Sequence, residues 1–161
     1  MINGVYHRTI KAIVDEIHKY KPDWTITKDF LPDNRPKLPY FYYELPIDYE
    51  RLTFNDVENE PFALHLQITA VAEDNLDAHE LSHDMRMLLR SLGLLADLRG
   101  QGISIVTVDS MAETPNNFGV AVETEAKLEL VVVANDNYDD TTQEGYIKGA
   151  DFSTEINSKE I

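Results

Sequence analysis

The segment Phe62–Ala70 reads FALHLQITA, and its larger apolar residues fall on alternate positions. Successive side chains of a β-strand point to opposite faces of the sheet. His65, Gln67 and Thr69 would therefore share one face, and the apolar row would occupy the other. This pattern predicts a half-buried strand with one face on a hydrophobic core. The apolar row consists of Phe62, Leu64, Leu66, Ile68 and Ala70.

The residues before this strand predict a helix followed by two strands. Residues 5–17 carry apolar side chains at helical spacing, with Asn3 placed to cap the helix and Pro22 to end it. Trp24 to Thr27 alternate as a short strand would, and the aromatic residues from Tyr40 to Leu45 are typical of another strand.

Polar and acidic residues 46–60 predict a long hairpin connection into the strand that begins at Phe62. After it, Asp74 and Asn75 precede a second helix, whose apolar stripe runs to Leu92 and which Gly93 would stop. Residues Leu94 to Arg99 would add another turn of helix. Strands are then predicted over 103–109 and 120–134. Hairpins dominate this order, so we expect an α+β fold. Its sheet would be mostly antiparallel, with the N-terminal helix and one crossover helix packed on it.

Composition favours one domain, expected over residues 1–134, and an acidic segment over 135–161. That segment holds seven acidic and two basic residues. It would be either a disordered tail or an arm whose apolar side chains, Tyr146 and Ile147 first among them, dock on a neighbouring subunit.

Charge and composition exclude several functions. The formal net charge is −15, although residues 1–40 alone carry +2 (seven Lys/Arg and five Asp/Glu). Tight binding to nucleic acid or to an anionic membrane needs a basic patch, which this chain lacks. The chain has no cysteine, so disulfides, thiolate metal sites and cysteine nucleophiles are excluded. No apolar run approaches the ~20 residues of a membrane span, and the first twenty residues lack a signal-peptide core.

One motif could carry chemistry. His79-Glu80-Leu81-Ser82-His83 matches HExxH, in which two histidines one helical turn apart bind zinc and the glutamate acts as general base. Charged Asp77 and Asp84 flank the motif, and no histidine follows His83. The histidines also lie about 160° from Leu81 on the helical wheel, on the polar face. We therefore expect no bound metal, no cofactor and no catalytic residue. A third ligand would have to come from Glu113, Glu123, Glu125 or Glu129.

The order of elements resembles that of the tail-terminator or neck-terminator proteins of tailed bacteriophages. The resemblance rests on a proline-rich entry into a strand (Arg35 to Tyr40), on the pattern Leu66 to Ala72, and on the helix Ala78 to Leu92. The strand from Gly102 to Val108 and the pair Tyr146-Ile147 complete it, so that it covers about residues 1–150.

This resemblance implies a non-enzymatic virion protein. Such proteins form a ring, usually a hexamer, that caps the tail tube and joins it to the head while DNA passes through without specific binding. The partners would be further copies of the chain, the tail tube protein and head-completion or connector proteins, with no membrane. Assembly would take place in the host bacterial cytoplasm, and the protein would reside in the tail or neck of the virion. Two alternatives stay open: a small zinc metallopeptidase built on His79, Glu80 and His83, or a head-completion (stopper) protein of the same neck.

Two groups of residues are the candidates for these roles. The last strand would place Val122, Thr124, Ala126, Leu128 and Leu130 on the core. Its other face carries Lys127 with Glu123, Glu125 and Glu129, which either face solvent or line the DNA passage, where like charge repels phosphate. The candidates for subunit contact are the 46–60 connection and the residues Tyr40, Phe41, Tyr42, Tyr43, Tyr146 and Ile147.

Overall fold

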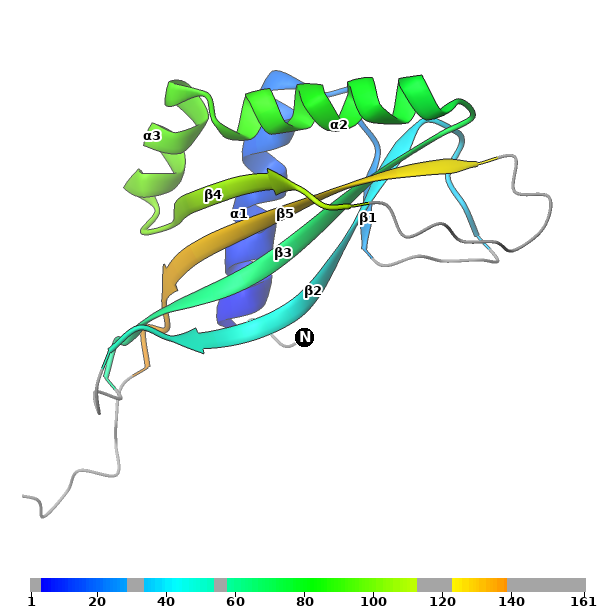
Figure 1. The fold of residues 1–161 in the computed structure, drawn as a ribbon. Helices are drawn as coiled ribbons and strands as arrows, with labels where there is room; N and C mark the ends of the chain where they lie inside the picture. Colours follow the sequence, from blue (N-terminus) through cyan, green and yellow to red (C-terminus); the bar gives the residue numbers. More distant parts are fainter. Residues whose placement is uncertain (1–3, 29–33, 54–57, 113–122, 139–161) are drawn as a thin grey trace, which may run out of the picture.

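The computed structural model describes residues 4–28, 34–53, 58–112 and 123–138. In these residues a five-stranded sheet, ordered β1-β2-β3-β5-β4, is combined with three helices, which confirms the α+β class (Figure 1). The β2–β3, β3–β5 and β5–β4 pairs are antiparallel, and only the short β1 runs parallel to its neighbour β2. The elements in chain order are α1 (Val5–Tyr20), β1 (Ile26–Lys28), β2 (Tyr40–Arg51), β3 (Pro61–Ala72), α2 (Asn75–Leu89), α3 (Leu92–Gly100), β4 (Ser104–Ser110) and β5 (Thr124–Asn135).

The core lies between the helices and one face of the sheet. The inward row of β3, from Phe62 to Ala70, packs with residues of all three helices in one apolar cluster. Ile13 and Ile17 of α1, and Met85 of α2, are fully buried there. The apolar row predicted for the last strand is likewise buried from Ala126 onwards, whereas Thr124 is only half-buried and Val122 lies outside the described residues.

The prediction that β3 is half-buried is wrong. Gln67, Thr69 and Val71 point away from the helices, yet each is buried. β3 is the central strand, and longer side chains from β2 and β5 close over its small ones. Tyr42 from β2 and Lys127 from β5, for example, flank Thr69 in the register.

Two predicted element boundaries need correction. Residues 46–51 belong to β2 rather than to a loop, because they continue the ladder with β3 across two bulges. Asp136 and Tyr138, which the expected division assigned to the acidic segment, hydrogen-bond through their backbones to Glu60 and Asn59 just before β3.

The second helix ends at Leu89 rather than at Gly93, and a separate helix α3 follows. The Asp74 side chain caps α2, because it accepts a hydrogen bond from the backbone N–H of Leu76 at 2.7 Å, whereas Asn75, expected before the helix, is its first residue. Leu92, placed on the apolar stripe, is 86% exposed. Asn3, expected to cap the first helix, lies outside the described residues, and Gly4 occupies the N-cap.

Candidate site on the open face of the sheet

The face of the sheet that points away from the helices carries a group of charged side chains. We call it the open face. Among the described residues, its permanently cationic side chains are Arg35 and Lys127. His65 also lies there, and a histidine with the ordinary pKa of about 6.5 is neutral above about pH 7. Six carboxylates and these two cations give the face a net charge of −4 when His65 is counted as neutral. Its carboxylates are Glu44, Glu50, Asp109, Glu123, Glu125 and Glu129.

The three glutamates singled out from the sequence do lie on this face, but none is a freely solvated charge. Glu123 accepts a hydrogen bond from Nη1 of Arg35 at 2.6 Å. Glu125 accepts one from the Tyr42 hydroxyl at 3.3 Å and lies 3.9 Å from Nζ of Lys127. The side chains of Glu123, Glu125 and Glu129 are 24%, 27% and 35% exposed. All three are therefore partly exposed, and the choice between facing solvent and lining a passage stays a prediction.

His65 lies at the centre of the open face, between two carboxylates. Its Nδ1 is 2.5 Å from Oε1 of Glu129, and its Nε2 is 3.0 Å from Oε2 of Glu50. The hydrogen bond to Glu129, and then the one to Glu50, raise the pKa of His65 above 6.5 because both stabilise the imidazolium form. Through these two contacts His65, on β3, connects to side chains of both neighbouring strands, β2 and β5.

Tyr42 is a second titratable group of this face, and it is buried. Burial, more than its acidic neighbours, raises the pKa of its hydroxyl to about 12. The phenol therefore stays protonated near neutral pH and donates its hydrogen bond to Glu125.

A second polar cluster lies at the far end of β2. We call residues 47–52, the end of β2 and the residue that follows it, the β2 arm. Glu60, a buried carboxylate beside the arm, accepts hydrogen bonds from Tyr49 at 2.5 Å, Thr53 at 2.7 Å and Arg51 at 3.3 Å. The hydrogen bonds from Tyr49 and Thr53 lower the pKa of Glu60. Figure 1 shows this end of the sheet curving away from α2.

Apolar side chains are exposed at both lateral edges of the sheet. The β2 arm exposes Ile47 (44%), Tyr49 (40%) and Leu52 (48%). Beyond Tyr43 the arm has no strand on its outer side among the described residues, because β1 pairs only with residues 41–43. At the opposite edge β4 is the last described strand, and Val106, at its bulge, is 60% exposed.

The aromatic cluster proposed for subunit contact needs correction. Tyr40, Phe41 and Tyr42 are buried within the chain, and Tyr43 is half-buried. Phe41 packs against Trp24 with ring centroids 4.8 Å apart. These residues stabilise the chain's own fold and offer little free surface. The other candidates, Tyr146 and Ile147, lie outside the described residues.

The HExxH residues lie on the exposed side of α2, as the helical wheel predicted. His79, Glu80 and His83 are all exposed, and Nη2 of Arg86 is 2.7 Å from Nδ1 of His83. Glu123, Glu125 and Glu129 lie on the open face, with the sheet between them and α2, while Glu113 is not described. Within the described ranges no group of three His, Asp or Glu side chains is placed to hold a metal ion.

Sequence reasoning did not find the contacts that organise this face. The sequence assigns His65 only to a face shared with Gln67 and Thr69, and it assigns Glu60 to the 46–60 connection. The only available signal was position, since His65 alternates with core residues and therefore had to share a face with Glu129 of the neighbouring strand.

Among the described helices, none is both long enough and apolar enough to cross a bilayer. Comparison of the chain with family models and with curated proteins gives no match, so its own residues carry the functional argument.

Proposed function

We propose that this chain is a non-enzymatic structural subunit of a ring that ends the tail tube of a tailed bacteriophage and joins it to the head. The ring would be a hexamer in the virion neck, assembled in the host cytoplasm, with the tail tube protein and head-completion proteins as neighbours. DNA would pass through its centre without specific binding.

One observation carries this proposal: the two lateral edges of the sheet are different, and both expose apolar side chains. A ring needs a heterologous interface, in which one surface of a subunit meets a different surface of the next. The β2 arm and the Val106 region of β4 lie at opposite edges and meet that requirement. Both edges contain bulges, which disfavour simple extension of the sheet. Contact between subunits would therefore be made by side chains.

The open face supports the role assigned to the passage. Its net charge of −4 would repel phosphate over about a Debye length, roughly 8 Å at physiological ionic strength. Glu123, Glu125 and Glu129 are the channel-facing candidates. Their hydrogen bonds to neighbouring side chains hold the charges in place.

Negative-stain electron microscopy and light scattering test the proposal together. The purified chain is examined across a concentration series, alone and with tail tubes added. We expect rings with a central hole, or binding to tube ends. A chain that stays monomeric at every concentration and also ignores tail tubes would refute the proposal.

A further inference from the structure

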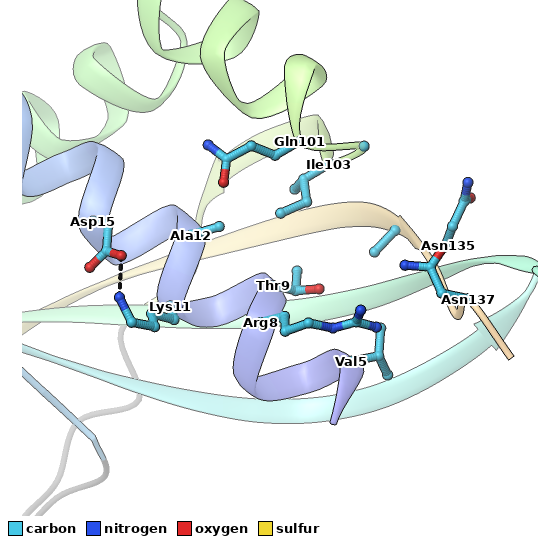
Figure 2. Close-up of a pocket in the computed structure, with 12 residues that line it drawn as sticks. Val5, Arg8, Thr9, Lys11, Ala12, Asp15, Gln101, Ile103, Asn135 and Asn137 are labelled. Atoms are coloured by element: carbon cyan, nitrogen blue, oxygen red, sulfur yellow. Dashed lines mark hydrogen bonds and ion pairs between the residues drawn. The ribbon is translucent and has the colours of Figure 1, made fainter. Parts of the chain in front are cut away.

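A groove lies between α1, the α3–β4 turn and the end of β5 (Figure 2). Its volume is about 470 Å³, within the range of roughly 300–1,000 Å³ that is usual for ligand-sized pockets. Figure 2 shows the side chains of α1 along one wall and those of Asn135 and Asn137 at the opposite end. Its apolar lining comes from Val5, Ala12, Ile103 and Ala134.

The lining of the groove is net cationic in an acidic chain. Arg8 and Lys11 line it, and Asp15 is its only lining carboxylate, so the charge of the lining is +1 in a chain of −15. Nη2 of Arg8 donates to the backbone carbonyl of Asp136 at 3.4 Å. This acceptor is neutral, so the hydrogen bond does not neutralise the charge of Arg8. Lys11 pairs with Asp15 on the exposed side of α1 (Figure 2).

The described chain ends beside this groove. Asn137 lines it, and the backbone carbonyl of Tyr138 is held by the N–H of Asn59 at 3.1 Å. Twenty-three residues of sequence follow, 139–161, with six acidic and two basic side chains, a net charge of −4. The same segment contains the apolar side chains Tyr146, Ile147, Phe152, Ile156 and Ile161.

We propose that, in the isolated subunit, this groove binds segment 139–161 of its own chain. The segment would place one or two of its apolar side chains on the apolar lining and its carboxylates next to Arg8 and Lys11. Because the segment begins at the rim, its effective concentration at the groove is in the millimolar range, so even weak contacts suffice. This inference goes beyond the ring and does not depend on it.

Disulfide trapping provides a direct test, because the chain has no cysteine of its own. Ala12→Cys in the groove is combined in turn with Gly145→Cys and with Ser153→Cys in the full chain. The matched control replaces Ala12→Cys by His7→Cys, which is exposed on the same helix but does not line the groove. Under mild oxidation we expect a disulfide within one chain to form faster with Ala12→Cys than with His7→Cys.

A charge-reversal pair tests the electrostatic part. Arg8→Glu with Lys11→Glu should slow trapping about threefold to tenfold, since each exposed charge contact contributes about a factor of three. Lys37→Glu with Arg90→Glu, both exposed and outside the groove, brings the net charge from −15 to the same −19 and should leave the trapping rate unchanged.

Three results would overturn the proposal. The first is a disulfide that forms no faster with Ala12→Cys than with His7→Cys, whether its partner is Gly145→Cys or Ser153→Cys. The second is equal slowing by the two charge-reversal pairs, with circular dichroism confirming that both fold. The third is a disulfide between two chains in place of one within a chain, which would assign the segment to the groove of a neighbouring subunit.

Discussion

Reversing the three glutamates of the open face is the sharpest perturbation of the proposed DNA passage. The variant Glu123→Lys, Glu125→Lys, Glu129→Lys changes the formal charge of the chain by +6, from −15 to −9. On the open face, the same change takes the net charge from −4 to +2. If this face lines the passage, a repelling wall becomes an attracting one.

The structure also sets the cost in stability. The variant loses the contacts of Glu123 with Arg35, of Glu125 with Tyr42 and Lys127, and of Glu129 with His65. Partly exposed pairs contribute about 0.2–1 kcal/mol each, so the loss from these four contacts is about 1–4 kcal/mol. At about 2–4 °C per kcal/mol for a chain of this size, the melting temperature should fall by roughly 2–16 °C. The variant should remain folded.

Binding of double-stranded DNA to the assembled protein is the assay. We expect the variant to bind DNA at low salt and to lose it as salt rises, with a logarithmic slope of about three per subunit engaged, from three new phosphate contacts. The matched control is Glu73→Lys, Glu80→Lys, Asp84→Lys, which adds the same charge at exposed positions outside the open face. A folded, ring-forming open-face variant that binds DNA no better than this control would place the three glutamates outside the passage.

Three further predictions concern metal, assembly and pH. Elemental analysis after metal-free purification should find no stoichiometric zinc, and about one zinc per chain would favour a metal site at His79 and His83. Val106→Lys should change stability by less than about 0.5 kcal/mol, since the side chain is largely exposed, yet abolish rings. Met87→Lys, exposed on α2, should leave rings intact, and equal behaviour of the two variants contradicts the interface. The pKa of His65 is raised above 6.5 in the folded chain, so its contribution to the free energy of unfolding is complete below pH 6.5 and lost as pH rises through the folded value. Urea unfolding of wild type and His65→Gln should therefore differ most in mild acid, and a difference independent of pH would contradict this linkage.

Alternation and helical spacing predicted most elements of the fold, because burial imposes those periods on the residues that face the core. They failed where polar side chains line a strand. Residues 46–51 resemble a loop, but pairing with β3 outweighs their weak strand propensity. Pro46 is tolerated because it lies between Glu44 and Ile47, where the register shifts and β1 no longer pairs with β2.

The boundary between α2 and α3 could not be read from periodicity, since leucines continue at near-helical spacing across it. Ser91 ends the first helix by donating its hydroxyl to the carbonyl of Leu88 at 2.7 Å and begins the second as N-cap. Gly93, expected to stop a helix, lies inside α3. A Cβ there would be 2.8 Å from the Tyr20 hydroxyl oxygen, which is the far end of an exposed side chain and can move aside.

For the candidate site, the sequence predicted only which kinds of residue are present and on which face of the last strand they lie. Alternation correctly placed Glu125, Lys127 and Glu129 together on one side of the last strand. Their partners come from positions more than sixty residues away in sequence, such as Tyr42 and His65. A single sequence contains no record of such pairings, because they depend on strand register rather than on local spacing.

The position of β5 has a consequence for how the chain folds. β5 comes last among the described strands, yet it lies between β3 and β4, so residues 124–135 must insert into a gap in the sheet. Until they are synthesised, β3 lacks one neighbour and β4 has no described neighbour at all. Their apolar rows then remain open to aggregation while the ribosome completes the chain. Folding should accordingly be slow for this length, because pairing Ala72 with Thr124 closes a loop of about fifty residues before the core can form.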